Sequence, residues 1–195
     1  MDRVVEEIEW FGRNGVTYTD NADANFGILP RDEEIAELFV KAKERWNNPE
    51  KFRTSFAKYS NKQIADRVHR IAKMLHRSGQ LKAVTLALQS VNDQTLVDIK
   101  RKNIAMDGFA DTQKSYAAEG IPTYVELILG LPGETYQSFK DGLDRVLDVS
   151  EENVFIYVCS VLPNSEMNHP EYRQKHGLQT VVMKAMLTHG NPIPG

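Results

Sequence analysis

The residue best placed to do chemistry is a glutamate inside an apolar segment that reads as a β-strand. In residues 123–129, Val125, Leu127 and Leu129 alternate onto one face and Glu126 onto the other. The aliphatic face should pack under helices, which puts Glu126 on the inner face of the sheet. A carboxylate there is costly to bury without a partner, so it indicates a polar binding site. The alternative is that Glu126 lies at an open sheet edge, solvated or paired with a lysine.

Two further segments extend this candidate site. In the strand expected at residues 83–89, alternation puts Gln89 on the inner face at the carboxyl end. Gly-Leu-Pro-Gly at 130–133 directly follows the strand that holds Glu126. The carboxyl ends of parallel strands are where α/β proteins usually place their sites. The glycine-rich segment is alternatively an ordinary strand-to-helix turn, and it lacks the Gly-Lys-Ser/Thr of a phosphate-binding loop.

Cysteine and histidine usage gives no reason to expect a metal site or a catalytic side chain within the chain. Cys159 is the only cysteine, so no internal disulfide is possible, and we expect it to be a small buried residue. His69 and His76 lie seven residues apart in one predicted helix without acidic or cysteine ligands nearby.

The net charge and the hydropathy of the chain limit the kinds of partner and the location that we expect. The formal net charge of −3 gives no reason to expect binding to nucleic acid or to an anionic membrane. No apolar run approaches the ~20 residues needed to span a bilayer, and no signal-peptide pattern begins the sequence. We therefore expect a cytoplasmic protein.

The elements that must position these residues alternate between strand and helix, which implies a parallel sheet. Strands are expected at 16–19, 52–57, 83–89, 122–129 and 153–160, with one more within 180–188. Helices are expected from residue 2, over 31–46, from the capping-box signal at 60–63 to the stop at 78–79, near 93–102 and 110–119, and over 135–149. The unit size fits a (β/α) barrel, but five units do not close one. We predict an α/β fold with a partial parallel barrel at 1–167, a C-terminal extension at 168–195, and an exposed first edge at 16–19.

Segments in this order resemble the radical S-adenosylmethionine (SAM) enzymes. Glu-Leu-Ile-Leu-Gly-Leu-Pro-Gly-Glu-Thr at 126–135 is similar to that family's fifth-strand motif. The other similar segments are 19–26 after the second strand, 86–91 on the fourth strand, 96–101 in the following helix and 161–165 after the sixth strand. Within the family, the members that carry a cobalamin-binding domain are the most similar. This similarity lies in the segments Asp-Ala-Asn-Phe-Gly-Ile and Leu-Pro-Asn-Ser-Glu-Met.

One departure from the family is large. Its C-x3-C-x2-C loop follows the first strand and binds a [4Fe–4S] cluster through three thiolates. This sequence has neither that loop nor that strand, and Cys159 on the sixth strand cannot replace it. We therefore expect that the first β/α unit is missing and that the chain is part of a longer parent.

The resemblance implies roles in SAM binding. Asp23 and Asn25 would lie near the methionyl amine, and Arg101 would bind the carboxylate. Gln89 and Glu126 would bind ribose hydroxyls. Ser90, which follows Gln89 in the same motif, is assigned to the cofactor-binding set. The backbone flanking the adenine would come from Gly130, Leu131, Pro132, Gly133 and Val161. Alternatively, Arg101 and its two lysine neighbours merely complement a helix C-terminus.

The function implied by the resemblance is that of the parent. It would cleave SAM reductively to a 5′-deoxyadenosyl radical, or methylate through cobalamin, with a [4Fe–4S] cluster and a reductant such as flavodoxin or ferredoxin. The substrate would be a small molecule or a peptide. One alternative is a cofactor-free β/α scaffold with an interaction or regulatory role, which iron content and UV–visible absorption would distinguish. A second is an aldolase-type barrel with a Schiff-base lysine, for which Lys58 is the one candidate.

Overall fold

The computed structural model describes residues 1–57, 62–103, 106–150, 153–182, 187–188 and 191–192. The helices are α1 (Asp2–Arg13), α2 (Arg31–Trp46), α3 (Lys62–Arg77), α4 (Asp93–Asp98), α5 (Met106–Ala118), α6 (Tyr136–Val149) and α7 (Pro170–His176), with a 3-10 turn η1 at Glu166–Asn168. The strands are β1 (Tyr18–Asp20), β2 (Lys51–Arg53), β3 (Val84–Gln89), β4 (Thr123–Leu129), β5 (Asn153–Val158), β6 (Leu187–Thr188) and β7 (Asn191–Pro192). Lys58 lies outside the described residues.

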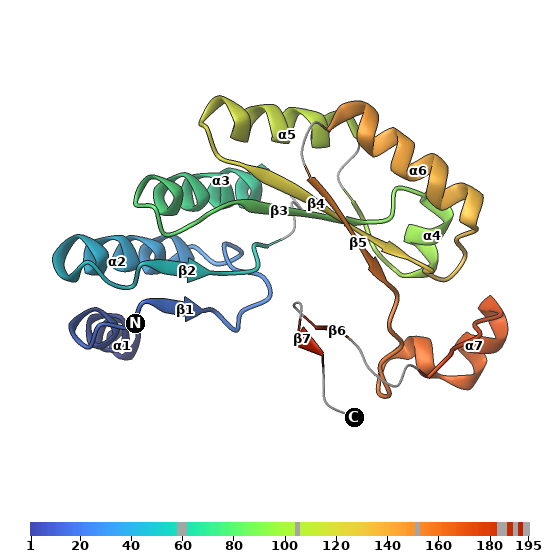
Figure 1. Cartoon of the computed structure of the whole chain (residues 1–195), viewed down its shortest axis with the longest axis horizontal. Coiled ribbons are helices and arrows are strands. Elements are labelled where there is room, and N and C mark those ends of the chain that lie inside the picture. The colour runs from blue at the N-terminus through green and yellow to red at the C-terminus, as the bar shows by residue number, and fades with distance from the viewer. Residues whose placement is uncertain (58–61, 104–105, 151–152, 183–186, 189–190, 193–195) are drawn as a thin grey trace.

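The predicted parallel arrangement is confirmed. β1 pairs with β2, and β3, β4 and β5 pair in sequence order, all in parallel. The arrows of β1 to β5 point to the same side of the molecule (Figure 1), so their carboxyl ends share one edge.

The parallel strands fall into two separate ladders, β1-β2 and β3-β4-β5. No ladder joins β2 to β3 among the described residues. β2 ends after three residues, and the described residues that follow it pair with the segment after β1 through the isolated bridge between Phe26 and Phe56. A backbone hydrogen bond of 3.1 Å from Phe52 N to Gln80 O ties β2 to the segment before β3 instead.

Side-chain alternation in the larger sheet follows the prediction. Val84, Leu86 and Leu88 of β3 are buried, as are Val125 and Leu127 of β4. Figure 1 shows α5 and α6 along one face of this sheet. The residues between the buried positions, including Gln89 and Glu126, are only half-buried because they belong to the opposite face. The core therefore lies between strands and helices, and the polar face remains accessible.

Four elements in the second half of the chain differ from the sequence expectation. The helix expected near 93–102 ends at Asp98, and the one expected near 110–119 begins at Met106. The strand expected within 180–188 is described only at Leu187–Thr188, which pairs antiparallel with β7. α7 was not predicted, although Pro170 at its first turn and Gly177 after its last residue are ordinary helix signals.

The first edge, β1, is short and carries an exposed Tyr18. An exposed edge invites association, so self-association of the chain stays a prediction. In the part of the chain that the structure describes, no helix has the length and apolarity to cross a bilayer.

The contact of α1 with α2 yields a stability prediction. A methyl group added at Gly12 would lie 2.5 Å from Cδ1 of Trp46, whose indole Nε1 also donates to Glu9 at 3.1 Å. Overpacking costs about 1–3 kcal/mol, and the better helix propensity of alanine returns up to about 1 kcal/mol. Gly12→Ala should therefore lower the free energy of unfolding by about 1 kcal/mol in urea titrations. The control Glu6→Ala, at an exposed position of the same helix, should change it by less than about 0.5 kcal/mol. Equal effects would contradict the close contact.

Candidate functional site

Gln89 holds a strained backbone conformation at the carboxyl end of β3. Its φ is +64°, which is uncommon for a residue other than glycine. The pairing with β4 shifts register between Ala87 and Gln89. A hydrogen bond of 2.8 Å from Ser90 N to Leu88 O closes a three-residue turn around Gln89. Such strain persists only where the surroundings enforce it, and it is common at binding sites.

Side chains from the connection after α4 enforce this turn. Asn103 Nδ2 donates to Leu88 O and to Ser90 O, both at 2.7 Å. Arg101 donates through Nη2 to Ala87 O and through Nε to Asn103 Oδ1, the latter at 2.9 Å. Arg101 therefore lies beside the turn at Gln89, and its guanidinium is half-buried.

The charge of Arg101 is not neutralised by a nearby acid. Among the described residues no carboxylate forms an ion pair with it, and burial alone lowers the pKa of its guanidinium. Its neighbours behave differently, because Lys102 is exposed and Lys100 forms an exposed ion pair of 2.5 Å with Glu166. Both lysines are therefore exposed, unlike Arg101 between them.

Ser90 joins β3 to the segment after β4. Its buried hydroxyl donates to Glu134 Oε1 at 2.6 Å and accepts from Asn92 N at 3.1 Å. Burial raises the pKa of Glu134, and its Oε2 is buried without a hydrogen-bond partner among the described residues. Glu134 belongs to the motif at 126–135, but sequence reasoning assigned it no role. Its place in that motif was the signal available.

The turn after β4 approaches its neighbours closely. Gly130 and Gly133 have φ of +87° and +78°, which favour glycine, while Leu131 and Pro132 between them are buried. At Gly133 any side chain would also overlap the carboxylate of Asp98. At Gly130 and Gly133 the turn therefore exposes backbone rather than side chains.

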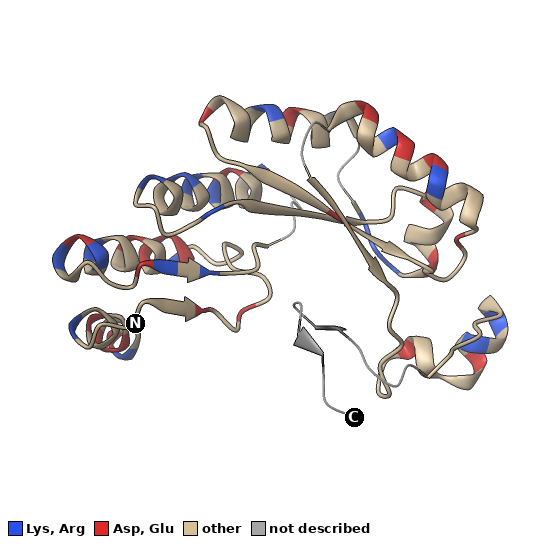
Figure 2. Ribbon diagram, in the orientation of Figure 1, with Lys and Arg blue, Asp and Glu red and all other residues tan. Residues whose placement is uncertain are grey.

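Glu126 lies on the central strand β4, not at a sheet edge. In β3, β4 and β5, all of whose residues are described, it is the only charged residue, and Figure 2 shows charges gathered on the helices instead. Burial raises the pKa of its carboxyl group, and Tyr157 donates to its Oε1 at 3.4 Å. Arg53 on β2 acts in the opposite direction by its positive charge. The predicted inward orientation of Glu126 is confirmed.

Asp23 and Asn25 lie in the turn after β1. Asn21 Oδ1 accepts from Asp23 N at 3.1 Å, and Asp23 Oδ1 accepts from Asn25 N at 2.8 Å. Asn21 also donates to Thr54 Oγ1 at 3.2 Å, and buried Phe26 anchors the end of the turn. Both predicted residues are exposed and lie in the turn that follows β1 of the smaller sheet. They share the carboxyl edge with Gln89 but not its hydrogen-bond network.

The segment after β5 forms the remaining side of the candidate site. Cys159 N donates to Leu129 O at 2.8 Å, which continues the pairing of β5 with β4. Burial raises the pKa of the Cys159 thiol, as suits a small half-buried residue. Val161 is half-buried two residues later. The described residues contain no group of three or more acidic, histidine or cysteine side chains able to hold a metal ion.

Comparison with known proteins identifies relatives of the chain. It is 44% identical over 181 residues to the cobalamin-dependent radical SAM methyltransferase TokK of Streptomyces tokunonensis. It is 43% identical over 181 residues to the 2-(S-pantetheinyl)-carbapenam-3-carboxylate methyltransferase of Streptantibioticus cattleyicolor. Each match covers 92% of this chain and 26% of the relative, so the chain spans about a quarter of the relatives' length. No family model matches the sequence.

The fold has a counterpart among solved structures. The radical SAM methyltransferase TsrM from Kitasatospora setae, solved with cobalamin and a [4Fe-4S] cluster bound, aligns with a TM-score of 0.64 at 16% identity. The alignment covers 91% of this chain and 32% of TsrM. The resemblance to radical SAM enzymes of the cobalamin-containing type is therefore confirmed, and so is the radical SAM-like α/β fold.

The buried carboxyl group predicts a pH-dependent stability. Because the folded-state pKa of Glu126 is raised above the usual 4.5, the folded chain binds its proton more tightly than the unfolded chain does. Stability should then fall as pH rises from 4.5 through the raised pKa. Glu126→Gln, whose amide oxygen still accepts from Tyr157, should be more stable than the parent at neutral pH, with the difference closing near pH 4.5.

Urea titrations at the two pH values measure this difference. The control Glu44→Gln, at an exposed position on α2, should not reproduce the effect. A Glu126→Gln variant less stable than the parent at neutral pH would show that the carboxylate is favourably paired.

Proposed function

We propose that this chain is the SAM-binding part of a cobalamin-dependent radical SAM methyltransferase. The sequence relatives support the class of reaction, and the polar groups at the carboxyl ends of β3 and β4 support SAM as the ligand. The observation that carries the proposal is the half-buried guanidinium of Arg101, which has no carboxylate partner among the described residues.

The chemistry of these groups fits SAM. Arginine has five N–H donors, and the two contacts of Arg101 leave others for a ligand carboxylate, which guanidinium can grip with two parallel hydrogen bonds. Glu126 and Gln89 offer oxygens that accept from the ribose diol. The backbone of Gly130 to Gly133 presents a flat surface to adenine, and Asp23 and Asn25 provide oxygens for the ammonium group.

SAM would be the source of the methyl group, and cobalamin, when bound, would supply the methyl-transfer chemistry. The residues of this chain would bind and orient SAM and exclude water from it. The substrate belongs to the class of small molecules or peptides, and the electrons would come from a flavodoxin- or ferredoxin-type protein.

A [4Fe–4S] cluster does not fit the residues of this chain. Such clusters are held by cysteine thiolates, whereas the sequence holds one cysteine, whose thiol is half-buried with a raised pKa. We therefore assign no step of cluster chemistry to these 195 residues.

The first prediction from this proposal concerns the chain by itself. Anaerobic reconstitution with iron and sulfide should give no cluster absorption. The family's cluster needs three cysteine thiolates, and the sequence has one cysteine. Incubation with SAM and dithionite should give no 5′-deoxyadenosine by liquid chromatography. Either a stable cluster or that product would contradict the assignment.

The second prediction concerns Arg101. Arg101→Lys should weaken SAM binding to the chain by about 1–3 kcal/mol, because lysine cannot form the paired hydrogen bonds to a carboxylate. Lys100→Ala and Lys102→Ala are matched controls at exposed neighbouring positions and should have little effect. Calorimetric titration of SAM compares the three. If Arg101→Lys binds SAM as tightly as the unsubstituted chain does, then Lys100, Arg101 and Lys102 only complement the C-terminus of a helix.

A further inference from the structure

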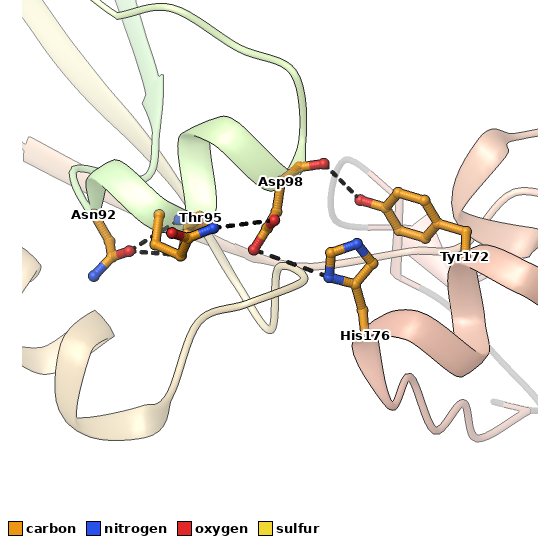
Figure 3. Close-up of polar contacts among 6 residues, drawn as sticks. Asn92, Thr95, Asp98, Tyr172 and His176 are labelled. Atoms are coloured by element: carbon orange, nitrogen blue, oxygen red, sulfur yellow. Dashed lines mark hydrogen bonds and ion pairs between the residues drawn. The ribbon is translucent and has the colours of Figure 1, made fainter.

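Helix α7 meets the end of α4 through a single aspartate. Tyr172 donates through its hydroxyl to the backbone oxygen of Asp98 at 2.9 Å, and His176 Nδ1 lies 3.9 Å from Asp98 Oδ2 (Figure 3). The rings of Tyr172 and His176 are 4.3 Å apart between centroids. One turn of α7 therefore contacts both the backbone and the side chain of Asp98.

This junction is buried although α7 is short. The side chain of His176 is 6% exposed and that of Asp98 is 14% exposed. His176 Nε2 is buried and has no hydrogen-bond partner among the described residues. Leaving a buried polar atom unpaired costs about 1–3 kcal/mol, so stability alone does not explain a histidine here. An apolar side chain would fill the same space without that cost.

The same aspartate contacts the turn after β4. Gln94 Nε2 donates to Asp98 Oδ1 at 3.2 Å, while Oδ2 occupies the space where a side chain on residue 133 would begin. Asp98, at the end of α4, thus contacts Gly133 of the turn on one side and α7 on the other. Glu134, the next residue, is held from the β3 side by Ser90.

We infer that Asp98 and His176 form a positioning pair that fixes the Gly130–Gly133 turn between α4 and α7. The link to SAM rests on the proposed function, in which this turn flanks the adenine. Neither side chain is assigned a contact with SAM. The Asp98 carboxylate packs against the turn at Gly133, and the His176 imidazole packs against the same carboxylate.

The experiment compares Asp98→Asn, His176→Gln and their double variant in the full chain. Asparagine keeps the shape of Asp98 and removes its charge, and glutamine removes the ring from His176. The amide NMR signals of Gly130 and Gly133 report the turn, and calorimetry reports SAM affinity. His169→Gln is the matched control, because His169 is an exposed histidine at the other end of α7 without a side-chain cap.

We expect both single variants to shift the two glycine signals and to weaken SAM binding about fivefold or more, a usual size for coupling between sites. The double variant should bind SAM no more weakly than the weaker-binding single variant. The reason is that both substitutions break the same contact between Asp98 and His176. His169→Gln should match the parent. If Asp98→Asn does not fold, His176→Gln tests the same contact from the other side.

Two results would overturn the inference. One is unchanged glycine signals in both single variants, and the other is additive losses in the double variant. A parent chain that binds no SAM, with glycine signals that still respond to both variants, would instead overturn the proposed function and leave the pair established.

Discussion

The carboxyl end of β3 depends on hydrogen-bond donors for carbonyl groups that the sheet does not satisfy. The register shift at Gln89 interrupts the ladder to β4, and buried carbonyl oxygens need a partner. Arg101 and Asn103 supply donors to the carbonyls of Ala87, Leu88 and Ser90. The same hydrogen bonds therefore fix the strained turn, the position of the guanidinium and the segment after α4.

How much of this was predictable from the sequence differs with the range of the interactions. The alternation in residues 123–129 correctly placed Glu126 on the inner face, because a period of two is a local property of a strand. The bulge at Gln89 was not predictable, because it depends on side chains that lie 12 and more residues later in the chain. The division between β2 and β3 also depends on pairing over long separations, which local patterns do not specify.

The candidate site shows the same distinction. Arg101 was found through resemblance to a family motif, whereas its contact with Ala87 and its half-buried state come from tertiary structure. His176 was given no role because a single histidine has no local signature, whereas Glu134 was given none although it lies in the motif at 126–135. Helix α7 carried Pro and Gly signals, but its seven residues give too short a period to detect.

Two charged groups of the site, Glu126 and Arg101, form no ion pair among the described residues. Burial raises the pKa of Glu126 and lowers that of Arg101, so each environment disfavours the charged form of its side chain. The nearest compensation for Glu126 is a tyrosine hydroxyl, and for Arg101 it is an amide and a backbone carbonyl. A ligand that donates from hydroxyl groups to Glu126 and offers a carboxylate to Arg101 would stabilise the charged forms of both, one on β4 and the other beside the end of β3. SAM has both kinds of group, which is the physical reason why these two costly side chains favour it as the ligand in the proposed function.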